Sequence, residues 1–356
     1  MIADFSWRDA GRAVVFRRGG AAGAVEVLRE NGVEEFELLS TERALGELPG
    51  AKGLAEAATG VHEVAKGQVP AAAGALMGAF APPPQAEEGV QVRPLVALGG
   101  GRVVDVAKAV ASVSGAEVVA VPTTLSGAPM TAIHRLPAGA EERVRGMVRP
   151  RLVIADPEAM TGQPEQELRA SAMNALAHGA DTLCSPLSNP VSEMTALRGA
   201  ELIGRALDEE REGREGAALA LGAILCGYAI DSAGLGLHHV ICQTLVRICG
   251  TSHAETNAAV LPHSMAFLAE RAPEAYERLA SSLCTEPDGL RERIEELGRP
   301  ERLSQLGGDE LKLDEALDAM LQRSELGRVP GPAVTREHLA RLVQRAWSRN
   351  PGFEHV

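Results

Sequence analysis

The chain has 356 residues, 45% of them hydrophobic, and a formal net charge of −13 at pH 7. A chain of this length can bury a large core and is expected to divide into two domains. The acidic balance argues against nucleic acid as a partner, because a polyanion would be repelled. We also expect no membrane contact and a cytoplasmic location, since the first residues lack a signal-peptide core and we expect no apolar stretch long enough to span a bilayer.

Residues 1–158 alternate apolar strand candidates with Ala-rich helices. This alternation predicts an α/β domain, in which a parallel sheet is covered by helices on both faces. Within it, the prolines and acids between Phe80 and Gly89 predict a solvent-exposed loop, because proline cannot continue a helix.

A glycine triplet, Gly99-Gly100-Gly101, follows the apolar run from Val92 to Leu98. The run predicts a buried strand, and the glycines are expected to open a helix that begins near Val103. Glycine permits close backbone approach, and the free amides of a helix N-terminus attract anions, so a diphosphate fits at this turn. A tight turn without a ligand is the commoner explanation of a lone triplet, whose spacing differs from the usual dinucleotide-binding fingerprint.

A second strand and loop, from Glu117 to Ser126, strengthen the interpretation as a ligand site. The loop carries the hydroxyls of Thr123 and Thr124 at the end of an apolar run. Ligands of open parallel sheets gather at the carboxyl ends of the strands, so both loops are expected to meet the same ligand.

From Glu165 onward the strand signals end and long helical patterns follow. We therefore predict a second, all-α domain over residues 159–356. The five cysteines, at positions 184, 226, 242, 249 and 284, lack Cys-x-x-Cys spacing and are odd in number, which predicts a reducing compartment rather than a disulfide framework.

Polar pairs with helical spacing stand out in this second half. Asn174 and His178 lie four residues apart, as do His239 and Gln243, so each pair would share one face of a helix. His253 would return to the same region from the next turn or helix start. Two such faces could converge on a cleft.

These motifs together resemble the iron-containing alcohol dehydrogenase superfamily, and within it the maleylacetate reductase branch. The resemblance covers nearly the whole chain, in family order, with the segments Gly99–Lys108, Pro122–Thr131, Asp156-Pro157 and Ser171–Asp181 besides the histidine region. It implies the dehydroquinate synthase-like architecture, in which a nicotinamide nucleotide-binding α/β domain precedes a helical catalytic domain. It also implies a homodimer, with the cofactor in the cleft between the domains.

The resemblance assigns a set of residues to the cofactor. The nicotinamide nucleotide site would be lined by Gly99, Gly100, Gly101, Asp105, Lys108, Thr123 and Thr124. Ser40, after an early strand, is expected to face the adenosine ribose together with Thr41, Glu42 and Arg43. A carboxylate there favours NAD and an arginine favours NADP, so we predict NAD and leave NADP open.

In the metal-dependent members of this superfamily, an Asp and three His residues hold a divalent ion. The corresponding positions here are Asn174, His178, Gln243 and His253. Two ligands are therefore amides and the only anionic ligand is absent, whereas zinc and ferrous iron prefer imidazole, carboxylate or thiolate. We do not expect a catalytic metal, although Asp181 and Glu255 are close enough in sequence to replace the missing ligands.

We therefore predict hydride transfer between nicotinamide and an alcohol, oxo or enol carbon, without a metal. His239 is the first candidate for the proton donor or acceptor, because an imidazole titrates near neutral pH. His178 or His253 would orient the substrate. Asn174 and Gln243 would donate hydrogen bonds to an oxyanion.

The substrate, a small molecule or a peptide, stays open. Reduction of maleylacetate itself would require cationic groups, yet the lysine that typically follows the paired histidines in that branch is Val240 here. A second alternative is a natural-product dehydrogenase that oxidises a C-terminal Thr of a peptide with loss of carbon dioxide. A third is a homologue that has lost catalysis and acts as a binding or scaffold subunit.

Overall fold

The computed structural model describes residues 5–9, 11–80, 92–209 and 214–348. Most of the loop predicted between Phe80 and Gly89 lies outside these residues. The chain divides into two compact units, Met1–Gln163 and Pro164–Val356, which are described separately below. The division falls after the short helix α6 (Pro157–Thr161), because Asp156 caps this helix and also accepts hydrogen bonds from the amides of Gly19 and Ala21.

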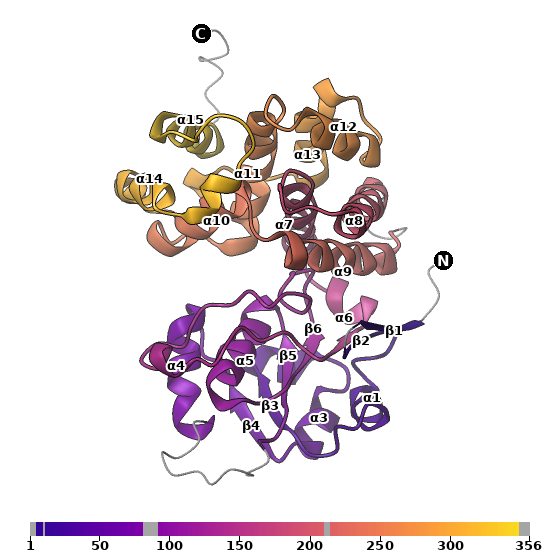
Figure 1. Cartoon of the computed structure of the whole chain (residues 1–356). Helices are drawn as coiled ribbons and strands as arrows, with labels where there is room; N and C mark the ends of the chain where they lie inside the picture. Colours follow the sequence, from indigo (N-terminus) through magenta and orange to yellow (C-terminus); the bar gives the residue numbers. More distant parts are fainter. Residues whose placement is uncertain (1–4, 10, 81–91, 210–213, 349–356) are drawn as a thin grey trace. The chain divides into compact units, whose positions relative to one another are not determined.

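The first unit contains a seven-stranded sheet with the order β1-β2-β7-β6-β5-β3-β4 (Figure 1). All neighbouring strands are parallel except β1 and β2, which form an antiparallel pair. The strands are β1 Phe5–Asp9, β2 Arg12–Phe16, β3 Glu37–Ser40, β4 Gly60–Glu63, β5 Leu95–Gly99, β6 Val118–Pro122 and β7 Leu152–Ala155.

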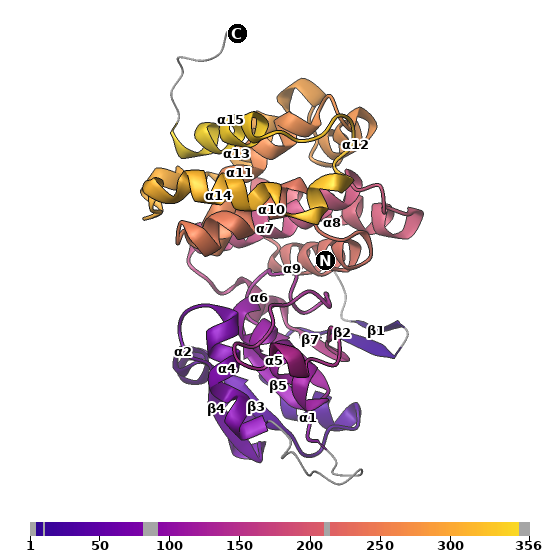
Figure 2. The same cartoon turned by 60° about the vertical axis from the view of Figure 1, so that its left-hand side comes forward.

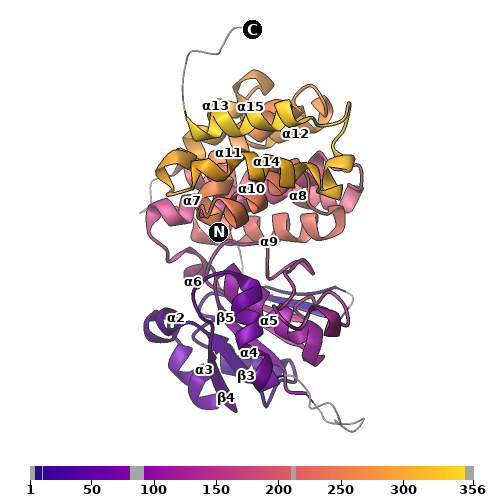
Figure 3. The same cartoon turned by 90° about the vertical axis from the view of Figure 1, so that its left-hand side faces the viewer.

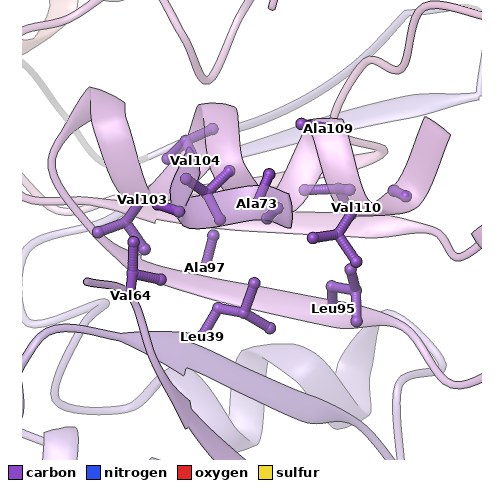
Figure 4. Close-up of a cluster of buried hydrophobic side chains, with 14 of the residues drawn as sticks. Leu39, Val64, Ala73, Leu95, Ala97, Val103, Val104, Ala109 and Val110 are labelled. Atoms are coloured by element: carbon purple, nitrogen blue, oxygen red, sulfur yellow. The ribbon is translucent and has the colours of Figure 1, made fainter. Parts of the chain in front are cut away.

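Helices cover both faces of this sheet, as the alternating pattern predicted. They are α1 Ala24–Glu30, α2 Glu42–Glu47, α3 Ala51–Ala57, α4 Val69–Phe80 and α5 Gly101–Ser114, with a 3-10 turn, η1, at Glu141–Arg143. Side chains of a strand alternate between faces, so Leu95 and Ala97 of β5 contact α4 and α5, while Val96 and Leu98 contact α1 and α3. Figure 4 shows the first of these two cores.

The strand order reverses direction between β3 and β5. From β3 the chain continues outward to β4, and from β5 it continues the other way, to β6 and then β7. Ser40, the last residue of β3, pairs in register with Leu98 of β5. The chain therefore leaves these two neighbouring strands in opposite directions, and open α/β sheets typically bind ligands at such a reversal of strand order.

The second unit is all-α, which confirms the predicted fold class. Its α-helices are α7 Glu165–Leu183, α8 Pro190–Asp208, α9 Gly216–Ala233, α10 Leu237–Ile248, α11 His253–Leu268, α12 Pro273–Ser282, α13 Leu290–Gly298, α14 Leu313–Leu321 and α15 Arg336–Trp347. Its 3-10 turns are η2 Pro287–Gly289, η3 Leu303–Gln305, η4 Glu310–Lys312 and η5 Ser324–Arg328. Helix α7 packs against α8, α9, α10 and α11 (Figure 2), and α14 and α15 pack beside α10 and α11 (Figure 3).

Helix α9 corrects one expectation from the sequence. Its 18 residues have a mean hydropathy of 1.5, so within the described residues it is the one helix long and apolar enough to cross a membrane by composition. It is nevertheless 67% buried inside the protein, against α7 and α8. Both properties are those of the core helix of a globular domain.

Two glycines of α4 give a matched test of this packing. A Cβ at Gly74 would lie 2.6 Å from the carbonyl oxygen of Ala138, whereas one at Gly78 would meet nothing within 4 Å. We expect Gly74→Ala to lower the free energy of unfolding by about 1–3 kcal/mol through overpacking. Gly78→Ala should raise it by up to about 1 kcal/mol, since alanine has the higher helix propensity. Urea unfolding of both variants checks this, and equal effects would contradict the described packing.

Candidate active site

The glycine triplet joins β5 to α5 and allows the surrounding backbone to pack closely. A Cβ at Gly99 would lie 2.6 Å from Cγ2 of Val103, in the first turn of α5. A Cβ at Gly100 would lie 3.0 Å from Cγ2 of Thr124, and one at Gly101 would lie 2.5 Å from Oγ of Ser126. The absence of these side chains brings the loop after β6 against the N-terminus of α5.

The two loops are also connected through their backbones. Gly99 pairs in register with Pro122 at the end of β6, and the amide of Thr123 donates to the carbonyl of Gly99 over 3.1 Å. Thr123 and Thr124 therefore follow β6 at the edge of the sheet where the glycine turn follows β5. Oγ of Ser126 lies buried here without a hydrogen-bond partner. Sequence reasoning did not single out Ser126, although its hydroxyl belongs to the same loop.

Three other residues assigned to the cofactor have contacts within the protein. Oγ of Ser40 donates to the carbonyl of Leu98 over 2.8 Å, so this hydroxyl joins β3 to β5. The ammonium of Lys108 is fully buried and donates to the carbonyls of Ala128, Thr131 and Ile133. It also lies 2.8 Å from Oδ1 of Asp105.

Lys108, which was predicted to line the cofactor site, makes its contacts with the protein itself. Its donors are used by backbone carbonyls, so the ammonium shapes the 128–133 loop instead of reaching a ligand. Asp105 neutralises that buried charge, and its side chain is 30% exposed. Both residues thus support the loop that lies beside the glycine turn.

The predicted polar residues of the helical unit lie on α7, α10 and α11. Asn174 and His178 occupy adjacent turns of α7, and Asp181 follows His178 by three residues on the same face. His239 and Gln243 are one turn apart on α10, whose first residue is Leu237. His253 is the first residue of α11.

Asp181 connects α7 to the N-terminus of α10. Its carboxylate accepts hydrogen bonds from the amides of Gly236, His238 and His239, over 3.0, 3.3 and 3.2 Å. These amides have no partner within their own helix, and the helix dipole favours a negative charge at this end. The same carboxylate is hydrogen-bonded to the imidazole of His239, with 2.7 Å between Nδ1 and Oδ2.

Gly236 makes this approach possible. A Cβ at this position would lie 2.7 Å from Oδ1 and 2.8 Å from Cγ of Asp181. Glycine is therefore required at this place because any side chain would push the carboxylate away from the helix end. The sequence signal was available, since Gly236 lies two residues before the first of the paired histidines.

The hydrogen bond to Asp181 fixes the orientation of His239. If Nδ1 carries the proton that is donated to Asp181, Nε2 is left with a lone pair. Nε2 of His239, Nδ1 of His178 and Oδ1 of Asn174 are all buried without a hydrogen-bond partner. The rings of His178 and His239 are stacked, with centroids 4.6 Å apart and an angle of 13° between their planes. Unpaired polar atoms in such a place are expected to meet a ligand.

Burial determines the charge of these groups. It lowers the pKa of His239 to about 3, and the neighbouring His253 lowers it further. Burial also lowers the pKa of His178 well below its ordinary value, as do the charges of His239 and His253. Burial raises the pKa of Asp181, while His238 and the three amides oppose that shift. Both imidazoles are therefore neutral at pH 7, and the carboxylate form of Asp181 is the one that can accept four hydrogen bonds.

His238 has a structural role. It is fully buried, with Nδ1 3.0 Å from Oγ of Ser264 and Nε2 2.9 Å from Oδ1 of Asn257. Its ring contacts that of His239 edge-on, with centroids 5.0 Å apart. Both nitrogens are used, so this ring packs α10 against α11 and supports its neighbour.

Two amides stand at the positions where the resemblance places ligands of a divalent ion. Oε1 of Gln243 accepts a hydrogen bond from Nη2 of Arg323 over 3.2 Å, so this oxygen is engaged within the protein. Asn174, the other amide, carries no charge to offset that of an ion. The described part of the chain also contains no group of three His, Cys, Asp or Glu residues placed to hold a metal.

Comparison with known proteins gives consistent matches. The family model described as Fe-containing alcohol dehydrogenase family, C-terminal, matches residues 169–347, and the iron-containing alcohol dehydrogenase model matches residues 26–162. Maleylacetate reductase 1 of Rhodococcus opacus is 34% identical over 264 residues, which cover 72% of this chain and 73% of that protein. The maleylacetate reductase of Rhizobium sp. (strain MTP-10005) is 31% identical over 362 residues, covering 96% and 97%.

Solved structures agree with the sequence matches. The crystal structure of maleylacetate reductase from Agrobacterium tumefaciens superposes with a TM-score of 0.78 at 30% sequence identity. The superposition covers 98% of this chain and 99% of that one.

The environment of His238 predicts a pH dependence of stability. Burial lowers its pKa to about 3, whereas an unfolded histidine titrates near about 6.5. The neutral form stabilises the fold fully above the unfolded pKa, and this stabilisation is lost as the pH falls below it. Between pH 7 and pH 5 the wild type should lose about 2 kcal/mol more unfolding free energy than His238→Asn.

Urea unfolding at several pH values measures this difference. In the wild type, the NMR signals of the His238 ring should show no titration over the same pH range. This second measurement tests the prediction even if the variant folds poorly. Titration of that ring between pH 7 and 5 would contradict its described burial.

Proposed function

Because the chain belongs to the iron-containing alcohol dehydrogenase family, and within it to the maleylacetate reductase-like branch, we propose that it is an NAD(P)-dependent oxidoreductase whose proton-transfer residue is His239. The observation that carries this assignment is the 2.7 Å contact between His239 and Asp181, which leaves Nε2 buried and unpaired. The motif-based family prediction is confirmed by the family models and the relatives.

The bound nicotinamide would supply the acceptor or donor of the hydride. In the direction of alcohol oxidation, the substrate hydroxyl gives its proton to Nε2 of His239, and the carbon releases its hydride. Asp181 holds Nδ1 in the required tautomer and stabilises the imidazolium that forms. In reduction, the neutral ring must first take up a proton from solvent at Nε2 and then gives it to the alkoxide or enolate. The low pKa of His239 leaves Nε2 unprotonated at neutral pH, so the ring begins alcohol oxidation as the proton acceptor.

His178 and Asn174 are proposed to position the substrate. His178 stacks on His239 and has a buried, unpaired Nδ1 in the same region, and Oδ1 of Asn174 is unpaired one turn earlier on α7. His253 influences both rings electrostatically and begins α11 beside them. No step of this mechanism requires a metal, in keeping with the guanidinium beside Gln243.

For the cofactor we propose NAD, with NADP as the alternative, bound at the glycine turn. Helix α5 begins at Gly101, and its first amides can receive a diphosphate. Thr123, Thr124 and the unpaired hydroxyl of Ser126 lie in the adjoining loop. At the end of β3, the guanidinium of Arg43 donates to the carboxylate of Glu47, so its positive charge is opposed and does not favour a ribose phosphate.

We propose maleylacetate as the first substrate to assay, because the relatives that match most of this chain are named as maleylacetate reductases. A homodimer in the cytoplasm, without nucleic acid or membrane partners, remains our expectation for the assembled enzyme.

The proton-transfer assignment can be tested by three variants. With maleylacetate and NADH, His239→Gln and Asp181→Asn should each lower kcat by about 100- to 10,000-fold, the range of general acid–base catalysis. Gly236→Ala should lower kcat in the same direction, because its Cβ displaces the Asp181 carboxylate. NADH binding should be unchanged in all three.

The matched control is Asp309→Asn, which alters an exposed carboxylate that caps the turn η4. It should keep the wild-type kcat. A His239→Gln enzyme with wild-type kcat would refute the proposed role.

The cofactor site can be tested by closing and reopening one contact. In Gly101→Ala, the new methyl group would clash with Oγ and Cβ of Ser126, at 2.5 and 2.9 Å, and push the loop from the helix end. We expect the Kd for NADH to rise at least about tenfold, which corresponds to about 1.4 kcal/mol. Adding Ser126→Gly removes both clashing atoms and should recover part of the affinity. Fluorescence titration measures both effects, and unchanged binding in Gly101→Ala would place the cofactor elsewhere.

A further inference from the structure

Gln243 lies one helical turn after His239, on the same face of α10. Its Oε1 accepts a hydrogen bond from Nη2 of Arg323, 80 residues further along the chain. A guanidinium has donors only, so the amide must turn its oxygen toward Arg323 and its NH2 group away from it. The Gln243 position therefore offers donors, and its oxygen is unavailable to a cation.

Arg323 is itself held in place by Glu325. Nε and Nη2 lie 3.2 and 2.5 Å from the two carboxylate oxygens, which is a two-point ion pair. The pair lowers the pKa of Glu325, so the carboxylate stays charged at neutral pH. The Arg323 side chain is 21% exposed, and its Nη1 has no hydrogen-bond partner among the described residues. The guanidinium is thus fixed along one edge and keeps two N–H groups for a ligand.

The segment that carries Arg323 also supplies a second cation. The turn η5 packs against α10. Its Arg328 lines a small pocket of about 10 Å³, room for one water molecule, together with Asp181 and Gly236. Two arginines from this turn region therefore lie near the elements that hold His239. Sequence reasoning found no cation for an acidic substrate, because the position after the paired histidines is Val240.

We infer that Arg323 and Gln243 form an anion-binding pair, in which Arg323 fixes the Gln243 amide and both side chains donate hydrogen bonds to a carboxylate of the substrate. This inference rests on the proposed function, since it names the substrate chemistry of the same site. The substrate class is a carboxylate-bearing alcohol, oxo or enol compound. Arg323 is a positioning and binding residue, and it takes no part in proton transfer.

The test measures ligand binding rather than turnover, so its result can be interpreted even if the protein does not catalyse hydride transfer. Calorimetry on the full chain would measure the Kd of maleate, a dianion, and of its uncharged dimethyl ester. Arg323→Met should weaken maleate binding at least about tenfold, the loss expected when a charge-assisted hydrogen bond is removed. Binding of the ester should not change. Arg323→Lys keeps the charge and should recover part of the maleate affinity.

Two further variants separate binding from folding. Arg336→Met removes an arginine that pairs with Asp314 and Asp318 on the surface of the same unit, and it should bind maleate like the wild type. The double variant Arg323→Met/Gln243→Met should lose no more maleate affinity than the single variant with the larger loss, because the two residues act as a unit. Wild-type maleate affinity in a folded Arg323→Met protein, or strictly additive losses, would overturn the inference.

A titration with Zn²⁺ provides an independent readout. If Oε1 of Gln243 is occupied by Arg323, this oxygen does not bind zinc. Any zinc bound by the wild type should therefore bind equally well to the Gln243→Met variant. Zinc binding at one equivalent that depends on Gln243 would overturn the proposed orientation of the amide.

Discussion

The site depends on one buried carboxylate. Asp181 accepts hydrogen bonds from three amides at the start of α10 and from the imidazole of His239, so a single side chain determines where α10 begins and how its first histidine is turned. A buried charge is costly without partners, and these four donors are what make the carboxylate tolerable on α7. The neutral rings of His178 and His239 then stack beside it. Removal of the charge would leave three helix-end amides and one ring nitrogen unsatisfied.

Both units use glycine to bring polar groups close to a helix N-terminus. In the first unit, Gly100 and Gly101 allow the threonine loop to lie against the first turn of α5. In the second, Gly236 allows Asp181 to reach the first turn of α10. The two helix ends differ in the group that accepts hydrogen bonds from their amides. At α10 the acceptor is a carboxylate of the protein itself, whereas at α5 it is proposed to be the cofactor diphosphate.

Local patterns predicted the parts of the fold that short segments determine. The strand, glycine turn and helix around Gly99 are present, although β5 begins at Leu95 instead of Val92, after Pro94. The pairs on α7 and α10 were predicted from helical spacing, and Asp181 could have been recognised with them, because it follows His178 by three residues. Arg323 could not be found in this way, since nothing in its neighbourhood indicates a contact with Gln243. Lys108 shows another limit of prediction from the sequence. Its place in the motif suggested a contact with a ligand, but only the folded loop reveals the three carbonyls that accept hydrogen bonds from its ammonium.

Helix α9 has a consequence for how the chain is made. Its sequence would suit a lipid bilayer, and only burial against α7 and α8 separates it from that environment. Both partners precede α9 in the chain, so a growing polypeptide has already presented their apolar faces when Gly216–Ala233 leaves the ribosome. The order of synthesis thus shortens the time during which this long apolar helix of the nascent chain is exposed to solvent.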